Sequence, residues 1–182
     1  PVADAFFVAF RIPNTFRRLF GEGSFNAAFV PSYSKELVKG KIKSKNFAND
    51  VFNFLALSLI ILVVLVELFM PFFVSLIAPG FRLDPQKYSL AIQLTKITFP
   101  FILFVSLASF FSAILNSHNK FAAAAAAPII LNILMIGVLI FGKILDEKLV
   151  VYLSYAVTFA GFTQIIFLLI FVKKYFVINI NF

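Results

Sequence analysis

Residues 6–26 read FFVAFRIPNTFRRLFGEGSFN, an apolar run of Phe, Ala, Val, Ile and Leu that also carries charge. Among its exceptions are three arginines, a glutamate and three residues that commonly interrupt helices: Arg11, Arg17, Arg18, Glu22, Pro13, Gly21 and Gly23. A guanidinium group is always protonated, so burying it without a partner is costly. Whether this stretch lies in water or in lipid therefore decides the fold of the whole chain.

The composition is that of a membrane protein. The chain is 62% hydrophobic and 13% charged, with a mean hydropathy of +1.00, whereas soluble domains are about 45–50% apolar and about 25% charged. Several apolar runs reach the ~20 residues that a bilayer-spanning helix needs. No run alternates strictly, and open sheet edges cannot lie in lipid. We therefore predict an all-α fold, a polytopic membrane helix bundle.

We expect residues 1–182 to form a single membrane domain with about five transmembrane helices. The expected spans are residues 4–33, 47–78, 88–116, 122–142 and 149–172. Several of them exceed ~20 residues and must tilt, kink or extend beyond the hydrocarbon. The first residue is Pro1 and no signal peptide is visible, so we expect an internal piece of a longer protein.

Basic residues are distributed unequally between the two sides of this topology. One side carries eight, five of them in the expected loop 34–50: Lys35, Lys39, Lys41, Lys43, Lys45, Lys120, Lys173 and Lys174. The other side carries four: Arg82, Lys87, Lys143 and Lys148. The positive-inside rule then places the loop 34–50 and the C-terminus in the cytoplasm and the N-terminus outside. The net charge of +8 thus belongs at a membrane surface, and we expect no nucleic acid partner.

No nucleophile–base pair, phosphate-binding loop or carboxylate pair stands out in the sequence. Cysteine is absent and His118 is the only histidine, which excludes disulfides, thiolate catalysis and Cys-ligated or multi-histidine metal sites. We therefore expect no enzymatic activity, no metal and no cofactor. His118 is expected to be solvated in a short loop. Asn116, Asn132 and Gln164 are expected to form hydrogen bonds between helices.

Helical phase gathers most polar residues of the opening stretch on one face. At about 100° per residue, an arc of about 120° holds six of them: Asp4, Arg11, Asn14, Arg18, Glu22 and Asn26. Arg17 lies off this stripe, at about 220° from Asp4. The stripe is expected to face an aqueous interior, and the apolar face to meet lipid or other helices.

Three interpretations of the stripe remain open. In the first, Arg18 pairs with Glu22 and Arg11 with Asp4, and these ion pairs hold helices together. In the second, the stripe is an anion-binding wall, because the planar guanidinium fork donates two parallel hydrogen bonds to phosphate and the local charge is positive. In the third, the arginines extend to an interface between membrane and water.

Longer stretches of the chain resemble a known family. The signature of the bacterial lipid II flippase family (MurJ/MviN) is similar to residues 4–37, DAFFVAFRIPNTFRRLFGEGSFNAAFVPSYSKEL. The family's next signature resembles residues 94–133, LTKITFPFILFVSLASFFSAILNSHNKFAAAAAAPIILNI, and the intervening APGF (78–81) fits as well. The resemblance extends to about Val172, but the alanine run replaces a more varied stretch.

The resemblance implies a transporter of fourteen helices in two lobes, of which this chain would be a fragment holding the second to sixth helices. Such proteins carry lipid II, an undecaprenyl-diphosphate-linked muropeptide, from the inner to the outer leaflet of the bacterial inner membrane. A cationic cavity takes the diphosphate, and the lobes alternate access. The implied partners are lipid II, membrane lipids and other cell-wall synthesis proteins. This chain alone is not expected to transport.

The resemblance also implies roles for individual residues. Arg17 matches the cavity arginine of the family, whereas helical phase favours Arg18, and this choice stays open. Arg11 fills a basic position, Asp4 and Glu22 match acidic ones, and Asn14 is a supporting polar residue of the stripe. Alternative functions are flipping of another lipid-linked glycan, multidrug extrusion within the same superfamily, or a truncated membrane protein that does not transport.

Overall fold

The computed structural model describes the backbone of residues 2–22, 24–142 and 148–179, and the side chains of these residues except 12, 16–22 and 24. Within them the chain is helical throughout its regular structure and contains no strand, so the all-α prediction is confirmed. The elements are α1 (Val2–Glu22), α2 (Ser24–Lys39), α3 (Lys41–Leu68), α4 (Met70–Ile77), the 3₁₀ helix η1 (Pro79–Leu83), α5 (Pro85–Thr98), α6 (Phe101–Ser117), α7 (Phe121–Gly142) and α8 (Leu149–Val172).

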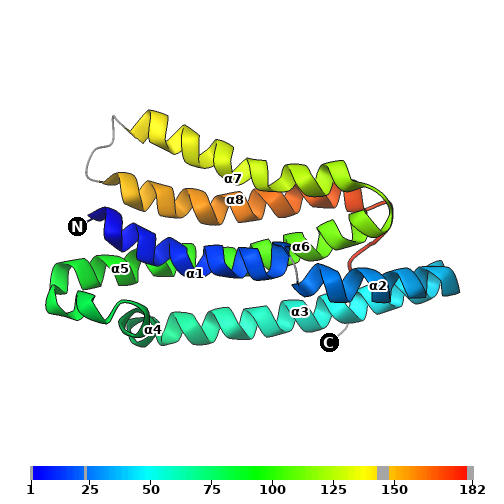
Figure 1. Ribbon diagram of the computed structural model, residues 1–182, viewed down its shortest axis with the longest axis horizontal. Helices are drawn as coiled ribbons and strands as arrows, with labels where there is room; N and C mark the ends of the chain where they lie inside the picture. The colour runs from blue at the N-terminus through cyan, green and yellow to red at the C-terminus, as the bar shows by residue number, and fades with distance from the viewer. Residues whose placement is uncertain (1, 23, 143–147, 180–182) are drawn as a thin grey trace.

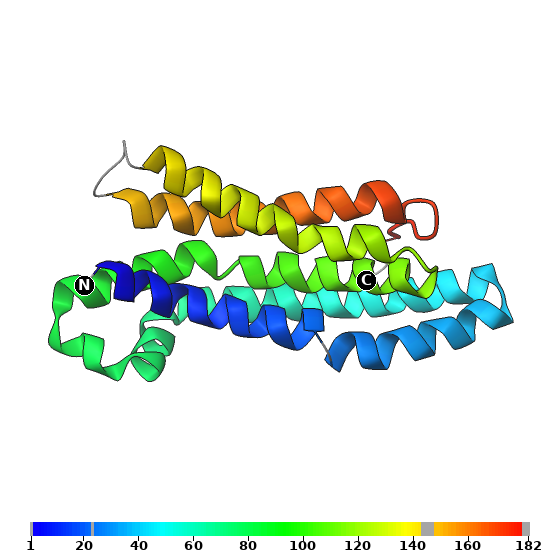
Figure 2. The ribbon, with the colours of Figure 1, turned by 45° about the horizontal axis from the view of Figure 1, so that its top comes forward.

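The helices form an elongated bundle around α6. Figure 1 shows α7 and α8 lying side by side along one edge of the bundle and α3 along the opposite edge. Helix α1 packs on α5 and α6. In the turned view of Figure 2, α7 and α8 again lie along one edge, and α1 and α2 lie along the opposite edge. Helix α6 contacts α1, α2, α3, α7 and α8, and eleven of its 17 residues are buried. It is the central helix of the fold.

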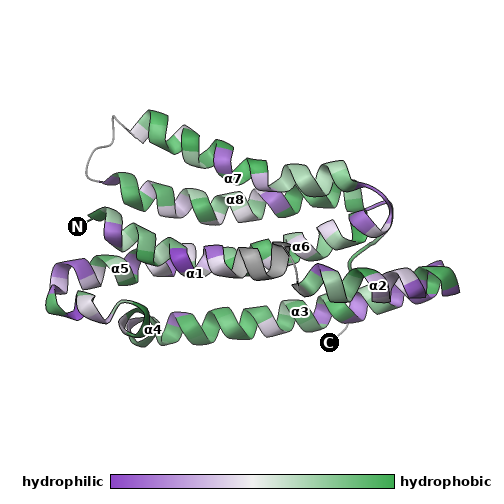
Figure 3. Cartoon of the chain, in the orientation of Figure 1, coloured by the Kyte–Doolittle hydropathy of each residue, from purple (hydrophilic) through white to green (hydrophobic). Residues whose placement is uncertain are grey.

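Four segments of the described chain are long and apolar enough to cross a membrane. They are Lys41–Leu68, Pro85–Ser117, Phe121–Gly142 and Leu149–Val172. The expected first span, 4–33, is not among them, because its first helix carries charged residues and ends at Glu22. Figure 3 shows the apolar character of α3, α7 and α8 along most of their lengths, with hydrophilic residues concentrated toward the ends of the bundle.

The expected spans 47–78 and 88–116 are each divided into shorter helices by a break. The span 47–78 changes direction at Phe69, between α3 and α4, just before Pro71. The span 88–116 is interrupted at Phe99 and Pro100, between α5 and α6. A proline has no N–H to donate and its ring clashes with the preceding turn, so both breaks have a local cause. That each of the five expected segments crosses the membrane remains a prediction.

The expected loop 34–50 is instead a tight helical hairpin. Helix α2 continues to Lys39 and α3 begins at Lys41, so only Gly40 is non-helical in this stretch. Gly40 has a φ of +125°, a conformation that side chains with a Cβ rarely adopt. Lysine and glutamate are good helix formers, which explains why a polar connection here stays helical.

Aromatic rings fill the core at the lysine-rich end of the bundle. The ring of Phe110 lies 5.2–5.6 Å, between centroids, from the rings of Phe29, Phe52, Phe111 and Phe176. These rings come from α2, α3, α6 and the segment that follows α8, and all five are buried. Ring pairs at this separation add about 0.5–1.5 kcal/mol each beyond the burial of their area. Phe110 therefore joins four parts of the chain.

The segment after α8 is held against α3. Besides the buried Phe176, the backbone N–H of Asn179 donates to Asn49 Oδ1 over 2.9 Å. The side-chain amide of Asn53 donates to the carbonyl of Asn179 over 3.2 Å. We call this contact, formed by Phe176 and Asn179 with Asn49 and Asn53, the tail clip.

His118 is half-buried, so the expectation of a solvated histidine was wrong. Its ring stacks on that of Tyr175, with centroids 4.1 Å apart, and its Nε2 lies 3.3 Å from the hydroxyl of Tyr33. The turn 118–120 is short, and this brings the imidazole between α2 and the end of α8. Burial lowers the pKa of the His118 imidazole below its usual range.

Helices α6 and α8 pack tightly against each other at Gly161. A Cβ added there would lie 2.7 Å from Phe101 Cδ2 and 2.8 Å from Phe104 Cβ, too close for either to remain in place. Gly137, on the outer helix α7, would meet nothing within 4 Å. Only the first of these glycines is required by packing.

We predict that Gly161→Ala lowers the free energy of unfolding by about 1–3 kcal/mol, the usual cost of overpacking. The matched control Gly137→Ala should leave it unchanged or raise it by up to about 1 kcal/mol, because alanine is the better helix former. Denaturant titration in micelles, followed by circular dichroism, measures both. Equal effects of the two substitutions would contradict the close approach of α6 and α8.

We predict that acidification weakens the contacts of His118. Because its pKa is lowered in the folded chain, its contribution to stability is complete above the usual histidine pKa, ~6.5, and is lost as the pH falls below it. The melting temperature should therefore drop more between pH 7.5 and pH 5.5 in the unchanged chain than in His118→Gln. An equal drop in both would show that His118 does not sense this range.

Candidate functional site

Helix α1 rests on α5 and α6 through small side chains. Ala5 and Ala9 are fully buried, and Pro13 is buried one turn further on. The hydroxyl of Thr98 donates to the carbonyl of Ala9 over 2.9 Å, across the interface between α1 and α5. Pro13 lies inside α1 without ending it. The opening stretch is thus one helix to Glu22, seated on the bundle along its small-residue face.

Arg11 and Asn14 are polar residues of α1 that are not part of this small-residue seat. Arg11 is exposed and Asn14 is half-buried. Among the described residues, none forms an ion pair or hydrogen bond with the Arg11 guanidinium group. A cation in this state can accept an anionic ligand without first breaking a contact.

The remaining predicted site residues on α1 are Arg17, Arg18 and Glu22. Their backbone belongs to the last two turns of the helix, but their side chains lie outside the described residues. The choice between Arg17 and Arg18 as the cavity arginine therefore stays open. Their roles in binding an anion stay predictions.

Asp4 pairs with a different residue from the one considered in the sequence. Its Oδ2 accepts from Lys87 Nζ over 2.8 Å, and the same ammonium lies 4.4 Å above the centre of the Phe81 ring. The pairing of Asp4 with Arg11, part of the first of the three interpretations, is not found. Arg11 lies seven residues further along α1, about 10 Å at 1.5 Å per residue, whereas α5 runs beside the start of α1. Asp4 thus holds α1 to α5 and neutralises Lys87.

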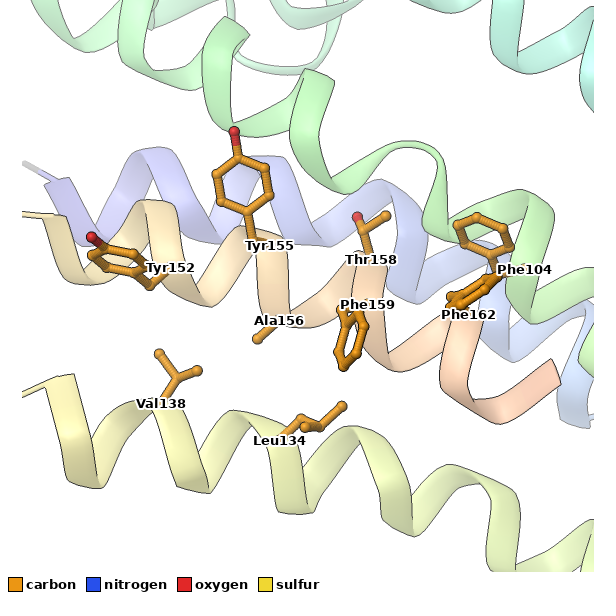
Figure 4. Close-up of a pocket in the computed structure, with 9 residues that line it drawn as sticks. All are labelled: Phe104, Leu134, Val138, Tyr152, Tyr155, Ala156, Thr158, Phe159 and Phe162. Atoms are coloured by element: carbon orange, nitrogen blue, oxygen red, sulfur yellow. The ribbon is translucent and has the colours of Figure 1, made fainter. Parts of the chain in front are cut away.

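A wide apolar groove lies between α7 and α8. It has a volume of about 540 Å³, and Figure 4 shows Leu134 and Val138 of α7 facing Ala156 and Phe159 of α8 across it. Phe104, Phe162, Thr158 and two tyrosines complete its lining. Such a lining offers almost only carbon, so the groove suits hydrocarbon rather than an anion.

A second pocket, of about 420 Å³, lies between α2, α6, α7 and α8. Its polar lining residues are Asn26, Ser109, Ser112, Asn116 and Gln164. The expectation that Gln164 and Asn116 bond helices together was wrong, because neither side chain forms a hydrogen bond to any residue that the structure describes. Sequence reasoning missed this pocket. The sequence feature that could have indicated it is Gln164, a single glutamine on the mostly apolar helix α8, together with the alanine run at the start of α7.

Metal-binding chemistry has no candidate in the described part of the chain. No cluster of three or more His, Cys, Asp or Glu side chains occurs among residues 2–22, 24–142 and 148–179. The functional groups that the structure does bring to its helices are a cationic side chain on α1 and neutral amides and hydroxyls in the polar pocket. These groups suit binding rather than bond chemistry.

Comparisons with known proteins agree with the resemblance in the sequence. A family model described as lipid II flippase MurJ matches residues 1–178. A probable lipid II flippase MurJ from Rickettsia prowazekii is 40% identical over 175 residues, which cover 96% of this chain and 34% of the relative. The corresponding protein of Rhizobium meliloti is 44% identical over 170 residues, covering 91% and 32%.

A solved structure of lipid II flippase MurJ in an inward closed conformation is similar as well. It superposes with a TM-score of 0.83 at 27% identity, covering 100% of this chain and 37% of that structure. The chain spans about a third of the length of the curated relatives that it matches. On the family match and the fold together, the chain belongs to the lipid II flippase family, MurJ.

Proposed function

We propose that this chain is part of a transporter that moves lipid II, the diphosphate-linked peptidoglycan precursor, from the inner to the outer leaflet. The observation that carries the proposal is the family match over residues 1–178. The chain covers about a third of its relatives, so the helices of the other lobe would complete the transport path. No bond is broken in this process, and we propose no enzymatic step.

The cationic residues of α1 would bind the diphosphate. Arg11 is exposed and has no partner among the described side chains, which supports a role in binding an anion. Arg17 and Arg18 follow within two turns of the same helix. A diphosphate offers several acceptor oxygens, and the guanidinium fork can bind two of them at once. Because arginine stays protonated at every physiological pH, this attraction persists in both access states.

Transport requires two conformations with different access and differential affinity for the substrate. The packing of this part of the chain suits a rigid unit, because α6 contacts five neighbouring helices and is largely buried. Rocking of such a unit against a second lobe would expose the arginines alternately to the two sides. Small residues at the seat of α1, Ala5 and Ala9, allow close packing of α1 on α5 and α6.

We propose the bacterial inner membrane as the location, with the lysine-rich end in the cytoplasm. The hairpin of α2 and α3, the turn 118–120 and the end of α8 lie at one end of the bundle, and the start of α1 lies at the other (Figure 1). The residues in and next to these connections include the eight lysines counted in the sequence. Anionic lipids and other cell-wall synthesis proteins are the proposed partners at that end.

Another lipid-linked glycan is the alternative substrate within the same mechanism. It would share the diphosphate and differ in its sugars, so the arginines of α1 do not distinguish the two. A cationic drug is disfavoured, since Arg11 would repel it. A chain without transport activity is the remaining alternative.

We predict that arginine substitutions on α1 impair transport. The test replaces the matching third of the Rhizobium meliloti relative with this chain and measures rescue of cell-wall synthesis in a depletion strain. Arg11→Ala and the double variant Arg17→Ala/Arg18→Ala should each reduce lipid II translocation at least about tenfold, since a charge-assisted hydrogen bond is worth about 1.5–3 kcal/mol. Arg82→Ala is the matched control, because Arg82 donates to Ser75 at the other end of the bundle.

A charge exchange separates anion binding from structural pairing. The double variant Arg18→Glu/Glu22→Arg retains an ion pair but moves the cation by one helical turn. Transport should be lost in this variant if the arginines bind diphosphate. Full activity of the exchanged chain, or of Arg11→Ala and the Arg17/Arg18 double variant, would overturn the proposed anion-binding wall.

A further inference from the structure

The hairpin of α2 and α3 projects beyond the rest of the bundle at its lysine-rich end. In Figures 1 and 2 it extends past the turn 118–120 and past the end of α8. We define the hairpin tip as residues 35–45, which comprise the end of α2, Gly40 and the start of α3. Only Gly40 is non-helical there, and its φ of +125° lets the chain reverse within one residue. The tip is therefore a compact protrusion rather than an irregular loop.

Two large aliphatic side chains at this tip are presented to solvent. Val38 is 90% exposed and Ile42 is 77% exposed, one on each side of Gly40. Single exposed apolar residues are common on protein surfaces and require no explanation. These two, however, flank the same one-residue turn, in the part of the bundle that projects furthest at this end. One partner surface can therefore reach both of them at once.

The hairpin tip also carries an excess of positive charge. It contains five lysines and one acidic residue, Glu36, which accepts from Lys39 Nζ over 2.6 Å. The other four lysines are exposed and form no ion pair with any residue that the structure describes: Lys35, Lys41, Lys43 and Lys45. Two apolar side chains flanked by unpaired cations match the apolar core and polar rim of a protein interface.

The membrane that α3 is expected to cross lies too far from the tip to cover it. Asp50 is exposed, and the uncharged part of α3 begins after it, at residues 51–66. Lys41 precedes Asp50 by nine residues, about 14 Å of helix at 1.5 Å per residue, and a tilt of about 20° shortens this height by only about 1 Å. The headgroup layer on one side of a bilayer is about 5–8 Å thick. The tip therefore stands in water beyond the headgroups.

An acidic protein surface fits both the charge and the apolar groups of the tip. Carboxylates would pair with the unpaired lysines, and an apolar hollow would remove Val38 and Ile42 from water. Attraction between the opposite charges would also speed the encounter. Two aliphatic side chains and their rim bury less than the ~1,200 Å² of a stable interface, so the contact would be transient.

We propose that the hairpin tip is a docking site for an acidic protein, with Val38 and Ile42 as its apolar anchors and the lysines as its charged rim. The assignment rests on the proposed function in one respect, the location of this end in the cytoplasm, and it adds the chemistry of the partner there. The anchors lie on α2 and α3, whereas the arginines lie on α1. Docking and anion binding thus involve different helices.

A synthetic peptide serves as the acidic probe. Glutamate and leucine form the two faces of its helix, and it is labelled with fluorescein and titrated against the full chain in phosphatidylcholine nanodiscs, with empty nanodiscs as the blank. We expect saturable binding that weakens as the salt concentration rises, because the charges are exposed. Val38→Ser/Ile42→Ser and Lys41→Gln/Lys43→Gln should each weaken it at least about tenfold, which is the loss expected of central interface residues.

Leu83→Ser is the matched control for the apolar anchors. Leu83 is also 90% exposed, but it belongs to η1 at the other end of the bundle, and its replacement should leave binding unchanged. Equal binding by Val38→Ser/Ile42→Ser and the unchanged chain, or no binding of the peptide at all, would overturn the proposal.

A fluorescent reporter distinguishes a protein partner from the membrane. The chain has no tryptophan, so Val38→Trp introduces a single indole at the tip. In nanodiscs of brominated phosphatidylglycerol its emission should stay unquenched, whereas that of Ile61→Trp, half exposed in the uncharged part of α3, should be quenched. Quenching of the Val38→Trp reporter would place the tip in the lipid and reject the acidic protein as its partner.

The location of the tip is tested in the chimera with the Rhizobium meliloti relative, after the relative's own cysteines are replaced. This chain has no cysteine, so Val38→Cys supplies one thiol for a membrane-impermeant maleimide. The thiol should be labelled in inside-out vesicles and not in intact cells. Labelling from the outer side would reject a cytoplasmic partner. Protection in the chimera but not in the chain alone would show that the second lobe covers the tip, which also overturns the proposal.

Transport assays separate this inference from the proposed function. In purified chimeras, Val38→Ser/Ile42→Ser should translocate lipid II at the unchanged rate, whereas Arg11→Ala should lose transport and still bind the peptide. Transport loss in Arg11→Ala without any peptide binding would reject the docking site and keep the anion-binding wall. Peptide binding that depends on Val38 and Ile42, together with full transport by Arg11→Ala, would keep the docking site and reject the role of Arg11.

Discussion

The burial of α6 is the constraint on which the rest of this structure depends. In lipid, helices gain little from burying apolar surface against one another, so close packing and interhelical hydrogen bonds must hold them together. Helix α6 meets that demand with eleven buried residues and contacts to five other helices. Gly161 allows α8 to approach it, and the Phe110 ring joins three further segments to it. The positions of the surrounding helices therefore depend on the packing surface of α6.

The charged residues lie around helix α6, which itself carries none. Lysines gather at one end of the bundle, and Asp4 and Lys87 neutralise each other at the other. Arg11 remains on the exposed side of α1, and the polar pocket contains only uncharged groups among its described lining residues. The bundle thus offers separate environments for an anion and for a neutral polar group.

Much of the fold followed from hydropathy, because apolar runs of this length can only be helices in a membrane. The breaks did not follow from proline alone. Pro71 and Pro100 lie at helix breaks, whereas Pro13, Pro31 and Pro128 lie inside continuous helices. A proline within a helix is tolerated where neighbouring segments compensate for its missing hydrogen bond, and the local sequence does not contain that information.

The site was less predictable for the same reason. The contact between Asp4 and Lys87 joins residues 83 positions apart, and no spacing rule indicates it. Gln164 was recognisable as a polar residue on an apolar helix, but its lack of a partner depends on three other helices. The side chains of Arg17, Arg18 and Glu22 lie outside the described residues, so the sequence remains the only basis for their roles.

The tail clip has a mechanical consequence. Because Phe176 and Asn179 hold the end of α8 against α3, torque applied at the C-terminal end of α8 passes into α3 without lengthening any helix. The end of α8 and the start of α3 should therefore move together, so a rotation of α8 at the lysine-rich end would also turn the hairpin of α2 and α3.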